Sequence, residues 1–115
     1  MMSESLTTIN LPKGLTVLYP DVFSCCYRLT GQIVIPEGVQ EIGSNAFLDT
    51  EITNLVIPTS VKSIREHAFR YCDRLTDIYY EGTQEQWAKI AIGSNNEALF
   101  SAQIHCQYVQ SSQKE

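Results

Sequence analysis

The stretch Ile52-TNLVIPTSVKSIREHAFRYCD-Arg74 is the clearest copy of a motif that this chain repeats. Similar segments begin at Leu6 and Leu29, and a fourth begins at Leu75 and then departs from the pattern, so that the four starts are evenly spaced along the sequence. A fixed period of this kind is typical of repeat architectures, in which each unit packs on the next. In every full copy a proline precedes a phenylalanine by eleven residues: Pro12 and Phe23, Pro36 and Phe47, Pro58 and Phe69.

The first half of each copy predicts a β-strand. In the clearest copy, β-branched residues alternate, which places Leu55 and Ile57 on the inward side and Asn54 and Val56 on the outward side. Pro58 then ends the hydrogen-bond ladder because proline has no N–H to donate.

The second half predicts another short extended segment, anchored by Val61 and Ile64 and followed by the Ala68-Phe69 step. One copy alone cannot bury these apolar anchors, whereas stacked copies bury them in one continuous column. The sequence therefore predicts a mainly β repeat solenoid.

The C-terminal part predicts a small unit that closes the stack. Thr83 is followed three residues later by Gln86, the pattern of a capping box, so a short helix is expected to begin there and to direct Trp87 inward as a lid. Residues 90–92 are expected to form a strand, 95–100 a second helical turn and 102–108 a final strand, which would cover the open end and blunt the sheet edge. The predicted organisation is a tail at 1–5, repeats at 6–80, a capping unit at 81–108 and a disordered tail at 109–115.

The N-terminal end lacks an equivalent cover, because only five residues precede Leu6. An open apolar end and an unpaired strand edge are association surfaces. Two interpretations stay open: the chain is the tail of a longer array, or it self-associates through this end, most simply as a two-fold dimer. The apolar residues expected at that end are Leu6, Ile9, Leu11, Leu15 and Leu18.

Composition excludes some classes of function. The 115 residues carry a net charge of −5, and the eight Lys and Arg residues are scattered, which argues against a nucleic-acid partner. No apolar run approaches the roughly 18 residues of a membrane helix, so no membrane insertion is expected. The sequence opens without a secretory signal, which predicts a cytoplasmic location if the chain is complete.

The motif L-x-x-I-x-I-P…V-x-x-I-x-x-x-A-F-x-x-C-x-x-L, best seen from Leu55 to Leu75, resembles the BspA-like or Treponema-type leucine-rich repeat. The segments 78–87 and 92–105 resemble the terminal unit that closes such arrays in gut Firmicutes proteins. The resemblance implies a right-handed leucine-rich-repeat coil of about three 23-residue repeats with a small α/β cap. It also implies a bacterial, secreted or surface-borne protein, linked to adhesion and to binding host or matrix proteins, with no common catalytic residues.

The cysteines are expected to be structural. Cys26 and Cys72 each follow a repeat phenylalanine by three residues, and Thr50 fills the same slot in the middle copy. A slot that accepts cysteine or threonine is a packing position, so both thiols are expected to be buried and unpaired. Neither cysteine–histidine spacing nor any other residue pattern predicts a metal ion or another cofactor.

No catalytic residues are predicted. His67 is interpreted as a solvated surface histidine, the acidic residues form no conspicuous pair, and no glycine-rich phosphate loop is present. The expected function is therefore a non-catalytic module for protein–protein interaction, the alternative being a structural spacer or cap of a longer array. The candidate binding face is the outward side of the main strands, where an exposed tyrosine favours an interface: Thr8, Asn10, Gln32, Val34, Asn54, Val56, Asp77 and Tyr79.

Overall fold

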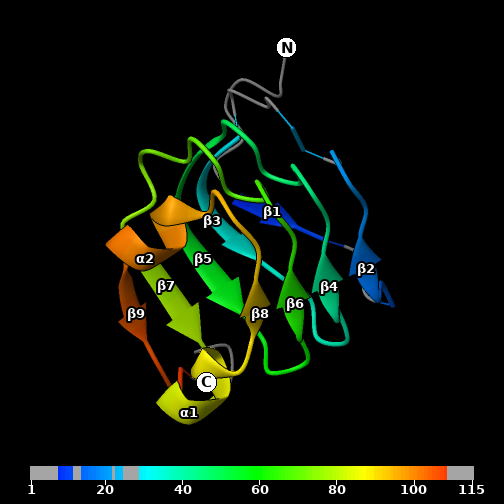
Figure 1. The fold of residues 1–115 in the computed structure, drawn as a ribbon, viewed down its shortest axis with the longest axis vertical. Helices are drawn as coiled ribbons and strands as arrows, with labels where there is room; N and C mark the ends of the chain where they lie inside the picture. The colour runs from blue at the N-terminus through cyan, green and yellow to red at the C-terminus, as the bar shows by residue number, and fades with distance from the viewer. Residues whose placement is uncertain (1–7, 12–13, 22, 25–28, 109–115) are drawn as a thin grey trace.

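A computed structural model describes residues 8–11, 14–21, 23–24 and 29–108. In this part of the chain, nine short strands form two parallel sheets (Figure 1). The five-stranded sheet contains, in spatial order, β1 (Thr8–Asn10), β3 (Thr30–Val34), β5 (Glu51–Ile57), β7 (Asp77–Tyr80) and β9 (Gln103–His105). The four-stranded sheet contains β2 (Val17–Leu18), β4 (Glu41–Ile42), β6 (Ser63–Ile64) and β8 (Ala91–Ile92).

The chain alternates between the sheets, with odd-numbered strands in one and even-numbered strands in the other. This connectivity confirms the mainly β fold and the two extended segments expected in each copy. Two short helices complete the described part: α1 (Gln84–Ala88) joins β7 to β8, and α2 (Glu97–Ser101) joins β8 to β9 (Figure 1). The right-handed turn of the coil and the count of three repeats stay predictions.

The pairing register is less even than the sequence period. Thr8 pairs with Gln32, one position beyond the repeat period, whereas Gln32 pairs with Asn54, one position short of it. The register also shifts within the β3–β5 pairing, where Gly31 pairs with Ile52 and the partner of Gln32 skips one residue. An extra residue of this kind is a β-bulge, which bends one strand against its neighbour. A constant step equal to the repeat period is therefore wrong as a description of the pairing.

The core lies between the two sheets. Phe47 stacks on Phe23 with ring centroids 5.4 Å apart and on Phe69 with centroids 5.2 Å apart, so the repeated phenylalanines form one column. The inward residues Leu55 and Ile57 have no exposed surface, as alternation along β5 predicts. Stacking of equivalent side chains from successive copies is what closes the interior of a repeat protein.

The C-terminal unit extends both sheets. β8 pairs with β6 and β9 pairs with β7, so the unit adds one further strand to each sheet, and β9 is the edge of the described sheet. With three residues β9 is short, and the expectation that this unit blunts the edge stays a prediction. The predicted capping box is confirmed: Thr83 Oγ1 accepts the Gln86 N–H, and Gln86 Oε1 accepts the Thr83 N–H.

Trp87 is not the buried lid that the sequence predicts. It is half-buried, and α1 contributes no fully buried residue. Tyr80, at the end of β7, is 1% exposed, and its ring meets the Trp87 ring edge-on at 5.3 Å between centroids. Because α1 lies beyond the strand ends, its tryptophan packs over the rim of the core while Tyr80 fills the interior (Figure 1).

Cys72 is buried and forms no disulfide, as predicted. Its thiol donates to the Phe47 carbonyl at 3.1 Å and lies 3.5 Å from Thr50 Oγ1, the residue in the equivalent slot. Cys25 and Cys26 lie outside the described residues, as do the predicted tails at 1–5 and 109–115.

His67, interpreted from the sequence as a solvated surface histidine, is half-buried and contacts a neighbouring turn. Its backbone φ is +64°, and its Nε2 lies 2.9 Å from Asn95 Nδ2. Asp21, Asn45 and Asn95 occupy equivalent turns with the same left-handed conformation. Asn, Asp and His are the side chains most often found there, which explains the polar residue at each turn.

Candidate functional site

The outward side of the five-stranded sheet, called the outer face below, places the predicted binding residues in two rows. One row runs across the strands through Thr8, Gln32, Asn54, Asp77 and Gln103, and the second through Asn10, Val34, Val56, Tyr79 and His105. All eight predicted positions thus belong to neighbouring rows. For Thr8 and Asn10 the structure describes the backbone alone.

Sequence reasoning missed the residues that β9 adds to these rows. Gln103 and His105 pair with Asp77 and Tyr79 at a sequence offset longer than the repeat period, because α1, β8 and α2 lengthen the connection. The usable signal was the alternation of the final predicted strand, in which Gln103 and His105 flank the half-buried Ile104.

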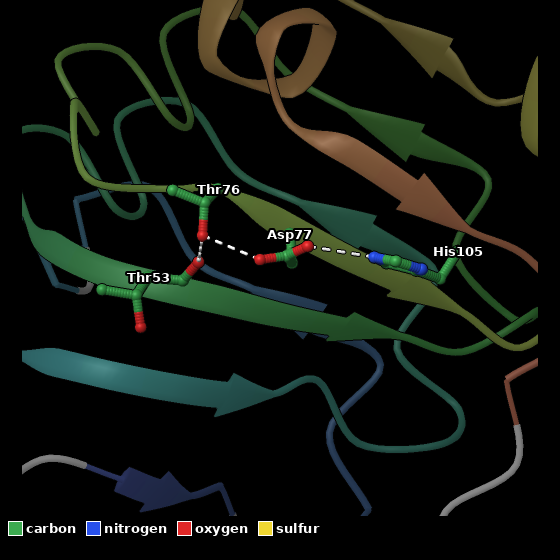
Figure 2. Close-up of polar contacts among 4 residues, drawn as sticks. All are labelled: Thr53, Thr76, Asp77 and His105. Carbon is green, nitrogen blue, oxygen red and sulfur yellow. Dashed lines mark hydrogen bonds and ion pairs between the residues drawn. The ribbon is translucent and has the colours of Figure 1, made fainter.

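An acid–aromatic cluster occupies the β7–β9 end of the outer face. The His105 ring stacks on the Tyr79 ring at 4.7 Å between centroids, and the Tyr108 ring lies tilted against Tyr79 at 4.9 Å between centroids. His105 Nε2 donates to Asp77 Oδ1 at 3.0 Å (Figure 2). We call Asp77, Tyr79, His105 and Tyr108 the outer-face cluster. None of the four is fully buried, so their rings and polar atoms are available to a partner.

Asp77 is held by two donors. Besides His105, the Thr76 hydroxyl lies 2.8 Å from Asp77 Oδ2 and 3.4 Å from the Thr53 carbonyl (Figure 2). The hydrogen bond from His105 is the main cause that lowers the pKa of Asp77, and the bond from Thr76 adds to it. Hydrogen bonds to the ionised form stabilise that form, so Asp77 presents a carboxylate at neutral pH.

Outside the outer-face cluster, the first row offers free polar groups, and the described side chains of the second row are apolar. In the first row, no side-chain hydrogen bond is found for Gln32, Asn54 or Gln103 within the described residues, so their carboxamides are free to bind a partner. In the second row, Val56 lies between Val34 and Tyr79 and is 1% exposed, so it supports its neighbours and contributes almost no surface of its own.

The cluster has no nucleophile. In the described part of the chain the hydrogen-bond partner of His105 is Asp77, and no serine, threonine or cysteine is bonded to its ring. Nucleophilic catalysis needs a base in contact with the nucleophile that it activates. Over the described ranges, no three His, Cys, Asp or Glu side chains gather closely enough to hold a metal ion. The arrangement suits recognition by aromatic contact and hydrogen bonding.

Comparisons with known proteins agree with the repeat analysis. Residues 1–111 match the family described as "BspA type Leucine rich repeat region (6 copies)". A solved structure of a leucine-rich cell surface protein from Faecalibacterium prausnitzii is similar, with a TM-score of 0.63 and 40% sequence identity. That match covers 66% of this chain and 20% of the Faecalibacterium protein, so the chain corresponds to a fifth of its relative's length. A search of curated protein sequences found no match.

The resemblance expected from the motif is thereby confirmed. Leucine-rich-repeat families are generally non-catalytic and generally mediate protein interactions, and both the family and the neighbour point to surface or secreted proteins. Neither of the short helices in the described residues has the length and apolar character that crossing a bilayer requires. The chain belongs to the BspA-type leucine-rich repeat family.

Proposed function

We propose that this chain is a non-catalytic protein-binding module and that its outer face, anchored by the outer-face cluster, contacts the partner. The observation that carries the proposal is the contact of the Tyr79 ring with both His105 and Tyr108, all three of them half-buried side chains on the outer face. Tyrosine supplies a large contact area at a small cost in conformational entropy, which is why it is enriched at the centres of interfaces.

The first row supplies specificity beside this anchor. Gln32, Asn54 and Gln103 offer free carboxamides, and Asp77 offers a carboxylate, at successive strand positions. Parallel strands lie about 4.8 Å apart, so such a row can bond in sequence to an elongated segment of a partner. The partner we propose is a protein exposed outside the cell, in a surface-borne or adhesive setting, because the related solved protein is a cell surface protein.

A second candidate function is a structural spacer or cap within a longer array. The C-terminal unit supports it, because β8 and β9 continue both sheets beyond the last regular copy. Among the described strands β1 is an edge of the five-stranded sheet, and self-association or continuation of the array at this end stays a proposal.

The test compares two tyrosine variants against a panel of purified extracellular-matrix and cell-surface proteins by surface plasmon resonance. For a partner that binds the wild-type chain, Tyr79→Ala is expected to weaken binding at least tenfold, the scale of about 1.4 kcal/mol for an interface anchor. Tyr19→Ala is the matched control, since Tyr19 is 66% exposed beside the other sheet. If both variants lost the same binding affinity while their thermal melts stayed unchanged, the outer face would be excluded as the binding surface.

A panel that detects no binding to the wild-type chain would favour the spacer function. That function predicts a different result: fusing the chain behind additional repeats should raise their melting temperature, whether or not Tyr79 is present. A terminal unit stabilises its neighbours through the shared interface between repeats.

A further inference from the structure

A cavity of about 230 Å³ opens beside the four-stranded sheet, between the turn that precedes β6, the end of β7 and helix α1. The polar residues of its wall are Thr59, Lys62, Tyr80, Gln86 and Lys89, and no acidic residue lines it. This is unusual for a chain with 13 acidic and eight basic residues. The cavity is separate from the outer face, since none of the residues in the two rows or in the outer-face cluster lines it.

Both lysines of the wall are exposed, and backbone hydrogen bonds fix the main chain from which each side chain extends. The Lys62 N–H donates to the Gln40 carbonyl, and the Lys62 carbonyl accepts the Ala91 N–H, so this residue is fixed between neighbouring strands. Lys89 is the C-cap of α1, and its N–H donates to the Gln86 carbonyl. Within the described residues neither ammonium group has an ion-pair partner, so both charges are available at the cavity.

Gln86 presents donors to the same space. The capping box uses its Oε1 as the acceptor for the Thr83 N–H at 2.8 Å, which assigns the other terminal atom as Nε2. An amide nitrogen carries two N–H donors and no acceptor. In the described part of the chain no partner is found for this nitrogen.

Tyr80 supplies the fourth donor. It is 1% exposed, yet its hydroxyl has no hydrogen-bond partner among the described residues. Every fully buried side-chain N or O atom of those residues does have a partner, so the Tyr80 hydroxyl keeps some contact with solvent, and Tyr80 is one of the residues that line the cavity. Burial raises the pKa of Tyr80, which keeps the hydroxyl protonated and able to donate.

We propose that this cavity binds an oxyanion, a phosphate, sulfate or carboxylate group, between Lys62 and Lys89, with Gln86 Nε2 and the Tyr80 hydroxyl as further donors. Two lysines in a lining that contains no acidic residue favour a negatively charged oxygen group, because charge-assisted hydrogen bonds are the strongest available to it. Thr59 can donate from the rim. The cavity is larger than one such group needs, so the oxyanion can be free or carried on a sugar or other small molecule.

The experiment is a two-dimensional NMR titration of the ¹⁵N-labelled chain at constant ionic strength. The probes are inorganic phosphate, acetate and glucose 6-phosphate, and the neutral matches are acetamide and glucose. Saturable shifts of the Gln86 side-chain NH₂ and of the Lys62 and Lys89 amides are expected with the anions and not with the neutral compounds. If glucose 6-phosphate binds more tightly than phosphate, the natural ligand carries its oxyanion on a larger molecule. If the two bind equally, the ligand is a free oxyanion.

Lys62→Gln and Lys89→Gln are each expected to weaken phosphate binding about tenfold, the scale of one charge-assisted hydrogen bond. Arg65→Gln removes the same charge from an exposed side chain outside the cavity wall and should leave the affinity within about twofold. Tyr80→Phe should weaken binding without lowering the melting temperature. Shifts that do not saturate, or an equal loss in the Arg65 variant, would overturn the proposal by showing general charge screening.

Discussion

The side chain of Asn96 closes a backbone ladder at Phe69. In the earlier turns the phenylalanine N–H donates to a backbone carbonyl of the next turn: Phe23 to Ala46 and Phe47 to Ala68. At the last turn Asn96 Oδ1 accepts the Phe69 N–H at 2.8 Å instead. Asn96 is 2% exposed and is the N-cap of α2, but its side chain does not cap its own helix, because it is committed to the repeat.

Replacing Asn96 by alanine should therefore be costly. The Asn96 amide also donates to the carbonyls of Arg65 and Gly93, each at 3.0 Å. The change therefore leaves the Phe69 N–H and the Gly93 carbonyl without a partner, whereas the Arg65 carbonyl keeps the Ala68 N–H. Each unsatisfied buried group costs about 1–3 kcal/mol, and we expect a total loss of about 3 kcal/mol with partial relief from water. Urea unfolding measures it. Asn54→Ala, which removes a free amide from the outer face, is the control and should change stability by less than about 0.5 kcal/mol.

The pH dependence of Asp77 has a definite sign. His105 and Thr76 lower its pKa in the folded state, so the ionised carboxylate contributes stability above the ordinary value of 3.8. That contribution should be lost as the pH falls below 3.8 toward the lowered folded-state value. Asp77→Asn should therefore flatten the acid limb of the stability profile, as measured by unfolding at pH 6 and pH 3. Identical acid limbs for both proteins would show that the bond to His105 is absent in solution.

The two described cysteines should react at different rates. Cys72 is 1% exposed and burial raises the pKa of its thiol, whereas Cys106 is half-buried. Because the thiolate is the reactive form, a maleimide should label Cys106 well before Cys72 in the native chain. Peptide mapping by mass spectrometry assigns each site, and unfolding in guanidinium should equalise the two rates. Faster labelling of Cys72 in the native chain would contradict the buried slot.

Tyr80 should matter more to stability than Trp87. Tyr80 is 1% exposed and lies inside the core cluster, so Tyr80→Ala should cost about 3–5 kcal/mol. Trp87 is half-buried and packs against the rim, so Trp87→Ala should cost roughly half as much. Urea melts of both variants establish the order. A larger loss for Trp87 would restore the interpretation of this residue as the lid of the core.

The left-handed backbone at His67 limits which side chains can replace it without strain. With φ at +64°, a β-branched residue is strained, so His67→Val should lower the free energy of unfolding by about 1–2 kcal/mol. The loss of the contact with Asn95 adds to this effect. His67→Asn is the matched variant, because asparagine already adopts this conformation at Asn45 and Asn95. It should stay close to the wild type in a thermal melt, and an equal loss in both variants would argue against backbone strain.

Local and periodic patterns were enough to predict much of this fold. The alternation in β5 assigned Leu55 and Ile57 to the core, and the spacing of Thr83 and Gln86 located the start of α1. These features depend on backbone periodicity or on contacts a few residues apart, which a sequence displays directly. The repeat also predicted which outward positions of successive strands become neighbours, since equal spacing brings equivalent residues together.

The tertiary structure decided which long-range contacts form where the repeat period is broken. The bulge between β3 and β5 appears only in the pairing of the two strands, and the longer offset from β7 to β9 follows from the α1, β8 and α2 segments between them. The β7–β9 pairing brings His105 to Asp77 and Tyr79. Asn96, which lies between β8 and α2, reaches Phe69. The sequence by itself thus determined the repeated architecture, whose contacts recur at a fixed spacing. The outer-face cluster and the closure at Asn96 depend on single long-range contacts, which exist only once the whole stack has formed.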